Sequence, residues 1–124
     1  MKITQQRTEG VNLIRRYGAD FILVGDQEVR ASCIISATTL TPWAPREIED
    51  VTLELLGPLF ALLPEVVVLS TGATQKFPRA ALRAEFATRR IGLEVMEIGA
   101  ACRTYNVLVD EERRVLAAVL LPGT

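Results

Sequence analysis

The sequence contains no histidine, and this absence narrows the possible chemistry more than any other feature. A Ser-His-Asp triad, a Cys-His dyad and a histidine-ligated metal site all need an imidazole ring, so this chain can build none of them. Any acid–base chemistry near neutral pH would fall to Glu, Asp, Cys, Tyr or Lys side chains whose pKa values are shifted. We expect the chain to bind no metal and no cofactor.

Cysteine is also scarce, with only Cys33 and Cys102 in the whole chain. The two residues lie far apart in the sequence and form no Cys-x-x-Cys pair, so no thiolate metal site is indicated. A disulfide would form only if the fold brought them together, and disulfide frameworks are typical of small secreted chains. We therefore predict two reduced thiols in a reducing compartment.

No stretch approaches the ~20 consecutive apolar residues that a membrane-spanning helix needs. The longest apolar run is interrupted by Pro64-Glu65. The first residues, Met1 to Arg7, lead into no apolar segment, which predicts that no signal peptide is present. These features predict a cytoplasmic protein that does not insert into a membrane.

A charge excess of one sign is missing as well. The 14 basic and 15 acidic residues give a net charge of −1, so no overall field would attract nucleic acid. The length of 124 residues suits one domain, and 49% hydrophobic residues suffice for an ordinary core. We expect residues 1–124 to form a single domain.

The first third of the chain has a β pattern. Phe21 to Val24 is apolar, Gly25-Asp26 is a typical two-residue turn, and Gln27 to Ile35 follows, which together predict a β-hairpin. In its second strand Val29, Ala31 and Cys33 alternate with polar residues, as expected for a half-buried strand. A further short strand is expected within residues 12–17.

The remaining chain alternates between helical and β patterns. Apolar residues from Glu47 to Leu63 recur on one face and predict an amphipathic helix, which Gly57-Pro58 should kink or split. The β-branched run Val66 to Leu69 predicts a strand covered on both faces, as in a parallel sheet. Strands that alternate with helices imply crossover units on one sheet, which makes this an α/β fold with a mixed central sheet. The later elements are expected as a helix from Phe77 to Thr88, a strand from Gly92 to Met96, a helix from Ala100 to Leu108 and a strand from Val115 to Leu120.

One candidate site follows the Val66–Leu69 strand. Thr71 and Gly72 lie in a small, hydroxyl-rich loop where α/β sheets bind ligands, outside the carboxyl ends of their strands. A loop with Gly lets backbone amides approach an anion. The alternative is a tight turn that needs Gly72 only for a positive φ.

A second candidate follows the Gly92–Met96 strand and should reach the same sheet edge. A helix that starts near Ala100 would direct free N–H groups into the crevice, with Arg103, Thr104 and Asn106 able to bind a carboxylate or phosphate. The alternative is structural, with Tyr105 packed in the core and Arg103 paired with a carboxylate. The helix start and Arg103 could also activate Cys102 as a nucleophile, although free cysteines are usually buried.

A third candidate is a protein-binding surface. Arg79, Arg83 and Arg90 are expected on one helical stripe, and Trp43 lies between prolines in a loop, where it could anchor an interface. A solvated helix face and a tryptophan that caps the core are the alternatives.

One segment resembles the signature of a widespread domain family of unknown function. The run Glu94-Val95-Met96-Glu97, followed by Ala100-Ala101-Cys102-Arg103-Thr104-Tyr105-Asn106-Val107-Leu108, carries the resemblance. Members of that family include uncharacterised bacterial and archaeal proteins and the mitochondrial respiratory complex I assembly factor 3. Ser70 stands where the family usually has Gly, and Ile98 where Thr is common.

The resemblance implies a single three-layer α/β domain with a mixed central sheet and an extra N-terminal β-hairpin. It also implies a non-catalytic protein-binding or assembly-assisting role, with a protein partner that the sequence does not identify. The alternative is a small-anion-binding protein or an enzyme, with a crevice formed by Thr71, Gly72 and Arg103.

Overall fold

The fold contains two sheets, seen here in a computed structural model that describes residues 10–123. Five strands form a mixed sheet in the order β5-β4-β8-β6-β7, and three strands form a separate antiparallel sheet in the order β1-β2-β3. The segment for which we predict no signal peptide, Met1 to Arg7, lies outside the described residues. The strands are β1 (Ile14–Gly18), β2 (Phe21–Val24), β3 (Gln27–Val29), β4 (Ala31–Ile35), β5 (Leu40–Pro42), β6 (Val66–Ser70), β7 (Gly92–Met96) and β8 (Val115–Pro122).

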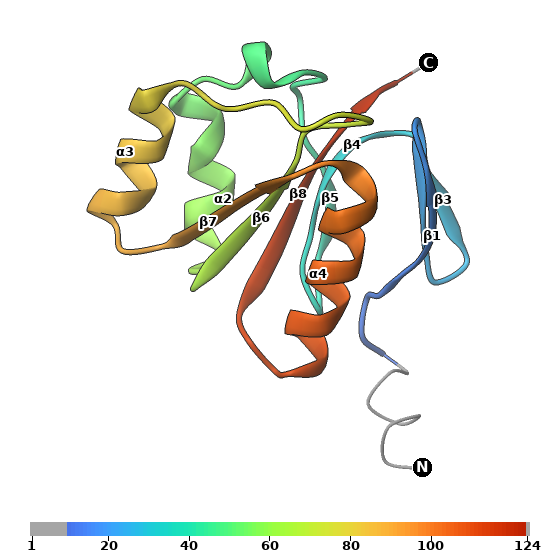
Figure 1. The fold of residues 1–124 in the computed structure, drawn as a ribbon. Coiled ribbons are helices and arrows are strands. Elements are labelled where there is room, and N and C mark those ends of the chain that lie inside the picture. The colour runs from blue at the N-terminus through green and yellow to red at the C-terminus, as the bar shows by residue number, and fades with distance from the viewer. Residues whose placement is uncertain (1–9, 124) are drawn as a thin grey trace.

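The helices cover both faces of the five-stranded sheet (Figure 1). The crossover from β6 to β7 and the return from β7 to β8 run in opposite directions across the sheet, so their helices lie on opposite faces. One face carries α4 (Ile98–Asp110) beside the small sheet. The other face carries the 3₁₀ turns η1 (Ile48–Asp50) and η2 (Glu54–Leu56) with α2 (Gly57–Ala61) and α3 (Ala80–Thr88).

The central strands β6 and β8 are buried on both sides because their side chains alternate between two cores. Val66 and Val68 face the core under α4 and the small sheet, whereas Val67 and Leu69 face the core under α2 and α3. Each fully buried aliphatic side chain of this kind stabilises the fold by about 1.5–3 kcal/mol. The predicted α/β class, the mixed sheet and the three layers are confirmed.

The N-terminal hairpin forms as predicted, but it does not extend the main sheet. β2 and β3 pair across the Gly25-Asp26 turn, and β1 pairs with β2 in the small sheet. The predicted long second strand is wrong, because it divides at Arg30 and only β4 joins β8. The predicted alternation also fails at a register shift between Ala31 and Cys33, where Ala31 is exposed and Ser32 is buried.

The helix predicted over residues 47–63, kinked or split at Gly57-Pro58, is broken more extensively, and the break lies at residues 51–53 instead. η1, η2 and α2 replace it, and Pro58 stands in the first turn of α2, where a missing N–H is tolerated. The helix after Phe77 begins later than expected, at Ala80, and α4 extends past both predicted ends. Among residues 10–123, no helix has the length and apolar character needed to cross a membrane.

Candidate functional site

The two predicted site segments meet at the carboxyl ends of β6 and β7. The Thr71 amide donates a hydrogen bond to the Met96 carbonyl at 2.9 Å, and the Ile98 amide donates to the Gly72 carbonyl at 2.8 Å. This contact follows from the parallel register, in which Ser70 lies opposite Met96. The topology therefore places both loops at one edge of the sheet, which we call the carboxyl edge.

Thr71 and Gly72 shape the first loop. The buried Thr71 hydroxyl lies 2.8 Å from the Thr74 carbonyl and accepts the Lys76 amide at 3.0 Å. Gly72 has φ +102°, a conformation that a residue with a Cβ rarely adopts. These contacts make the loop a closed turn held by its own backbone.

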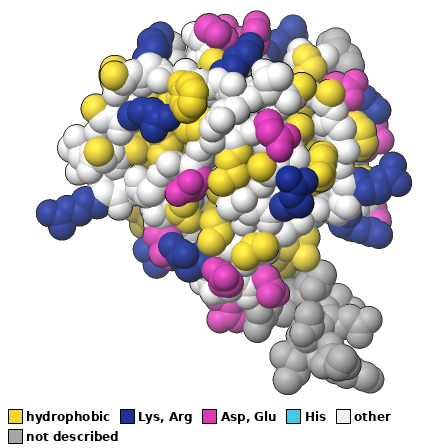
Figure 2. Space-filling view, in the orientation of Figure 1, with side chains coloured by type: hydrophobic (Ala, Val, Ile, Leu, Met, Phe, Trp, Pro, Cys, Tyr) yellow, Lys and Arg dark blue, Asp and Glu magenta, His cyan; other side chains and the backbone are white. Residues whose placement is uncertain are grey.

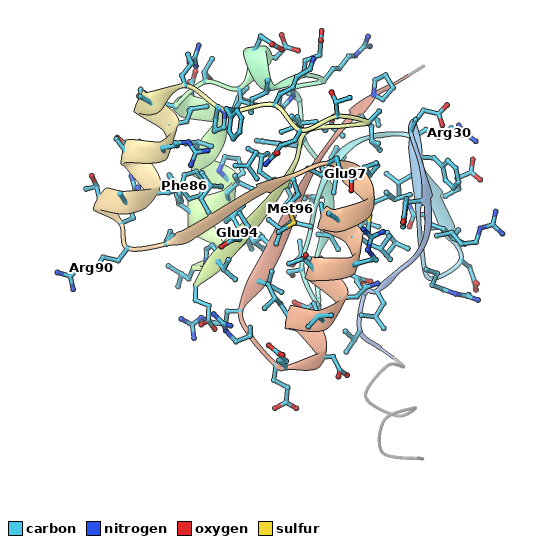
Figure 3. The ribbon with its side chains drawn as sticks, in the orientation of Figure 1. Arg30, Phe86, Arg90, Glu94, Met96 and Glu97 are labelled. Carbon is cyan, nitrogen blue, oxygen red and sulfur yellow. The ribbon has the colours of Figure 1, made fainter. Side chains whose placement is uncertain are left out.

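The start of α4 is capped by its own chain. Both carboxylate oxygens of Glu97 accept backbone hydrogen bonds, from Gly99 at 2.7 Å and from Ala100 at 2.8 Å. These bonds lower the pKa of Glu97, and the Arg103 charge adds to that effect. Figure 3 shows Glu97 where β7 passes into α4. The Glu97 carboxylate thus occupies the place where a bound anion would meet these amides.

Arg103 is directed toward the small sheet. Its Nη1 donates to the Tyr17 hydroxyl at 2.6 Å, and Tyr17 is 41% exposed at the surface. Gly99 makes room for this contact, because a Cβ there would lie only 3.0 Å from the Tyr17 hydroxyl oxygen. The guanidinium therefore links α4 to β1.

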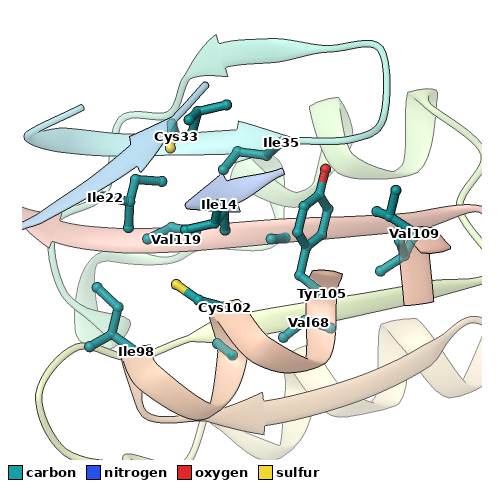
Figure 4. Packing of buried hydrophobic residues seen from close by; sticks show 14 of the residues in the cluster. Ile14, Ile22, Cys33, Ile35, Val68, Ile98, Cys102, Tyr105, Val109 and Val119 are labelled. Carbon is teal, nitrogen blue, oxygen red and sulfur yellow. The ribbon is translucent and has the colours of Figure 1, made fainter. Parts of the chain in front are cut away.

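The next three residues also bond to other elements. The Asn106 amide accepts from the Ile14 N–H and donates to the Ile14 carbonyl, both at 2.9 Å. The Tyr105 hydroxyl donates to the Asn12 carbonyl at 2.8 Å, and its ring is buried in the core (Figure 4). Thr104 donates to the Met96 sulfur at 3.3 Å. Four consecutive polar side chains, Arg103 to Asn106, thus join α4 to neighbouring elements, and we call them the α4 clamp.

A hollow of about 390 Å³ opens at the carboxyl edge, but its lining includes only some of the residues predicted for the site. Thr71 and Gly72 line it together with the basic side chains Arg46 and Lys76. Arg103, Thr104 and Asn106 lie outside its lining. The assignment of Thr71, Gly72, Arg103, Thr104 and Asn106 to a bound ligand stays a prediction.

The two thiols are free and buried. Burial raises the pKa of Cys102 to about 12, and the charge of Glu97 acts in the same direction against the smaller opposing effect of Arg103. Burial likewise raises the pKa of Cys33 to about 12. A nucleophilic cysteine needs a lowered pKa, so this environment has the opposite effect to the one considered for Cys102.

The predicted partner-surface residues do not form one stripe. Trp43 is buried at 6% exposure and donates from its indole nitrogen to the Leu55 carbonyl at 3.0 Å, so it caps the core. Arg79 and Arg83 are exposed at the start of α3, whereas Arg90 follows the helix end with φ +59°. The stripe fails because α3 ends at Thr88, before Arg90.

Sequence reasoning missed two contributors to this edge, Tyr17 and Arg46, and it named Glu97 only as a possible partner of Arg103, not as the helix cap. Glu is not among the preferred helix caps, so the pattern indicated a helix start at Ala100 rather than Ile98. Tyr17 and Arg46 reach the edge from distant parts of the chain through the small sheet and the loop before η1. No local pattern indicates either contact.

Comparison with known proteins gives a match over most of the chain. The profile of the family described as "Protein of unknown function (DUF498/DUF598)" matches residues 14–120. The chain is 29% identical over 124 residues to the zebrafish (Danio rerio) protein named "NADH dehydrogenase [ubiquinone] 1 alpha subcomplex assembly factor 3", covering 98% of this chain and 71% of that protein. It is 23% identical to a Francisella tularensis protein named "13 kDa major membrane protein", covering 97% and 99% of the two chains.

Solved structures share the fold. An NMR structure of a Xanthomonas campestris protein has 33% identity and a TM-score of 0.85, covering 99% of this chain and 94% of that one. A crystal structure of a Bordetella parapertussis protein has 29% identity and a TM-score of 0.84, covering 90% and 97%. A Bordetella pertussis protein described as a Mth938-like domain has 25% identity and a TM-score of 0.78, covering 90% and 87%.

Proposed function

We propose a function on the premise that this chain belongs to the DUF498/DUF598 family of proteins of unknown function: it is a non-catalytic protein-binding domain that assists the assembly of a larger complex. The observation that carries the proposal is the likeness to the zebrafish assembly factor, which extends over 98% of this chain. A frog protein (Xenopus tropicalis) with the same name matches 88% of it. Both names refer to a respiratory NADH dehydrogenase, so a membrane-bound respiratory complex is the first partner to test.

The internal contacts of the α4 clamp support a non-catalytic role. This polar segment bonds to its own fold through Arg103, Tyr105 and Asn106. Both thiols have raised pKa values, so neither is a ready nucleophile near neutral pH. The small-anion alternative gains no support, because Arg103 contacts Tyr17 and does not line the hollow beside Gly72.

A partner surface at the start of α3 is consistent with this function. Phe77 is 70% exposed, and the Arg83 guanidinium lies 5.8 Å from the centre of its ring. Figure 2 shows hydrophobic and basic side chains next to each other on this part of the molecule. Aromatic and arginine side chains carry much of the binding energy in protein interfaces. We propose that Phe77, Arg79 and Arg83, named here the α3 surface, contact the partner.

A deletion strain tests the function directly. We expect native gels of its membranes to show less of an assembled respiratory complex and more of its subassemblies. The tagged full chain should restore the complex and co-purify with its subunits. Phe77→Ser should restore the complex less well. The matched control is Val107→Ser, which removes an exposed apolar side chain on α4, away from the α3 surface, and should behave like the unchanged protein. Normal complex levels in the deletion strain would contradict the assembly role, and thermal stabilisation by phosphate or a small carboxylate would favour the anion alternative.

A further inference from the structure

Three helices end at the opposite edge of the sheet, where β6, β7 and β8 begin; we call it the amino edge. Each helix is followed by a residue other than glycine in the left-handed conformation: Leu63 after α2 (φ +55°), Arg90 after α3 (φ +59°) and Glu112 after α4 (φ +61°). Glycine is preferred at this position, and a side chain there costs about 1–2 kcal/mol. Backbone strain of this kind is concentrated at functional sites, so the surroundings of these three side chains are informative.

Leu63 is the most prominent of these side chains, with 75% of its surface exposed. It borders a hollow of about 400 Å³ whose apolar wall also includes Phe60, Pro64 and Ile91. A second hollow of about 240 Å³ shares Pro64 and Arg114 with the first and adds Leu62. We call the larger of the two, which Leu63 borders, the amino-edge hollow.

The rim of the amino-edge hollow is basic. Arg89, Arg90 and Arg114 line it, and Arg89 lies 4.3 Å above the Phe60 ring. Among the described residues that line the hollow, Glu65 is the one carboxylate, and it already accepts hydrogen bonds from Arg113 Nε and from the Arg114 amide, both at 3.0 Å. Within residues 10–123 no ion pair involves Arg90, which projects away from the end of α3 (Figure 3). Arg89 pairs with Glu85 at 3.5 Å, and the Arg114 Nε donates to the Leu63 carbonyl at 3.3 Å, which leaves Arg90, among the described residues of the rim, as the guanidinium without such a contact. An apolar wall beside such a guanidinium favours an occupant that is both acidic and apolar.

We propose that the amino-edge hollow binds a short acidic segment of a partner protein, with one bulky apolar side chain against Leu63 and carboxylates on Arg90 and Arg114. This inference rests on the proposed protein-binding function and names the chemistry of the partner. An anionic membrane fits less well, because exposed acidic residues, Asp110 and Glu111, end α4 at the same edge. Figure 2 shows acidic side chains gathered at that lower end of the molecule. They would repel a flat anionic surface, whereas a peptide can lie in the hollow beside them.

NMR titration of the full chain tests this chemistry with three pools of nine-residue peptides. The first pool has a central Phe or Leu flanked by Asp and Glu, the second replaces the acids with Asn and Gln, and the third keeps the acids around a central Ala. We expect the first pool to bind about tenfold more tightly than the others, which corresponds to about 1.4 kcal/mol. The shifted amides should include Leu63, Arg90 and Arg114. Equal binding of all pools, or shifts confined to the α3 surface, would overturn the proposal.

Variants separate binding from folding. Leu63→Gly removes the apolar anchor and relieves the left-handed backbone, so the fold should be retained while peptide affinity falls about tenfold. Arg90→Glu should weaken the first pool similarly, and Leu53→Ala, at an exposed leucine outside the hollow, should change nothing. The chain is also tested on vesicles of phosphatidylcholine with phosphatidylglycerol. If the chain binds these vesicles but no peptide, and Leu63→Gly abolishes the vesicle binding, the proposal is overturned in favour of a membrane. If Leu63→Gly captures the respiratory subunits as well as the unchanged chain, the hollow proposal fails and the assembly function stands; if neither captures them, the function itself fails.

Discussion

Two buried serines in the five-stranded sheet have opposite surroundings. Ser32 of β4 is 4% exposed, and its hydroxyl both donates to the Leu121 carbonyl at 3.2 Å and accepts the Leu121 amide at 2.8 Å. Ser70 of β6 is fully buried, and its hydroxyl has no hydrogen-bond partner among the described residues. A buried polar group without a partner lowers stability, whereas the same group with two partners supports it.

Alanine substitutions should therefore have opposite signs at these positions. We expect Ser70→Ala to leave the free energy of unfolding unchanged or raise it by up to about 1 kcal/mol, since no bond is lost. Ser32→Ala should lower it by about 1–2 kcal/mol, because the Leu121 groups lose their partner. Urea denaturation of both variants measures the difference. If Ser70→Ala lowers the free energy of unfolding as much as Ser32→Ala does, the Ser70 hydroxyl must have a hydrogen-bond partner.

At the scale of an element, the Glu97 cap makes the stability of α4 dependent on pH. Backbone hydrogen bonds from Ala100 and Gly99 lower the pKa of Glu97 in the folded state, below the ordinary value of 4.5. A lowered folded pKa gives a stabilising contribution that is fully present above the unfolded value and is lost as pH falls through the folded value. The cap therefore matters most at neutral pH.

Glu97→Gln tests the sign of this dependence. The amide keeps one acceptor but cannot ionise, so we expect a lower urea midpoint than the unchanged protein from pH 7 down to about pH 5. Below that range the two midpoints should converge as Glu97 becomes protonated. Midpoints measured at intervals down to pH 3 give the comparison. A gap that stays constant to pH 3 would contradict the capping account.

The α4 clamp makes a second element-scale prediction, about the attachment of the small sheet. Asn106→Ala leaves the N–H and carbonyl of Ile14 without their partner, so we expect a loss of about 2 kcal/mol. Amide hydrogen exchange should accelerate most in β1 and β2 and least in β6. Thr104→Val, on the same helix, loses only a weak bond to sulfur and is the matched control. Uniform acceleration across both sheets would argue against a local clamp.

Sequence patterns predicted the elements whose own residues determine their burial. The continuous apolar run of β6 and the alternating crossovers were sufficient for the central sheet, because the parallel geometry buries such strands on both faces. The division of the predicted second strand at Arg30 and the 3₁₀ turns within residues 48–56 depend on contacts with distant segments. The local periodicity of the sequence therefore does not predict them. The same limit applies to the site. The order of strands and helices predicted that Gly72 and Arg103 lie near one edge of the sheet. The direction of the Arg103 side chain depends on Tyr17 from the other sheet, which no local pattern indicates.

At the scale of the whole molecule, the small sheet and α4 together cover one face of the five-stranded sheet. Their shared core contains Ile14 and Ile22 from the small sheet, Cys33 from β4 and Cys102 from α4 (Figure 4). Both thiols are about 2% exposed. Because they lie beneath the contact that the clamp maintains, exposure of either thiol reports separation of these layers.

Thiol alkylation should therefore measure how firmly the layers are held. With pKa values raised to about 12 and almost no exposure, both cysteines should resist iodoacetamide at pH 8 in the folded protein and react fully in urea. If the small sheet opens as a unit, Asn106→Ala should accelerate the labelling of Cys33 and Cys102 together, by more than its loss of global stability explains. Mass spectrometry of each labelled peptide over time gives both rates. Ser32→Ala, which weakens the fold outside the clamp, is the control, and equal acceleration in the two variants would mean that the thiols are reached only through global unfolding.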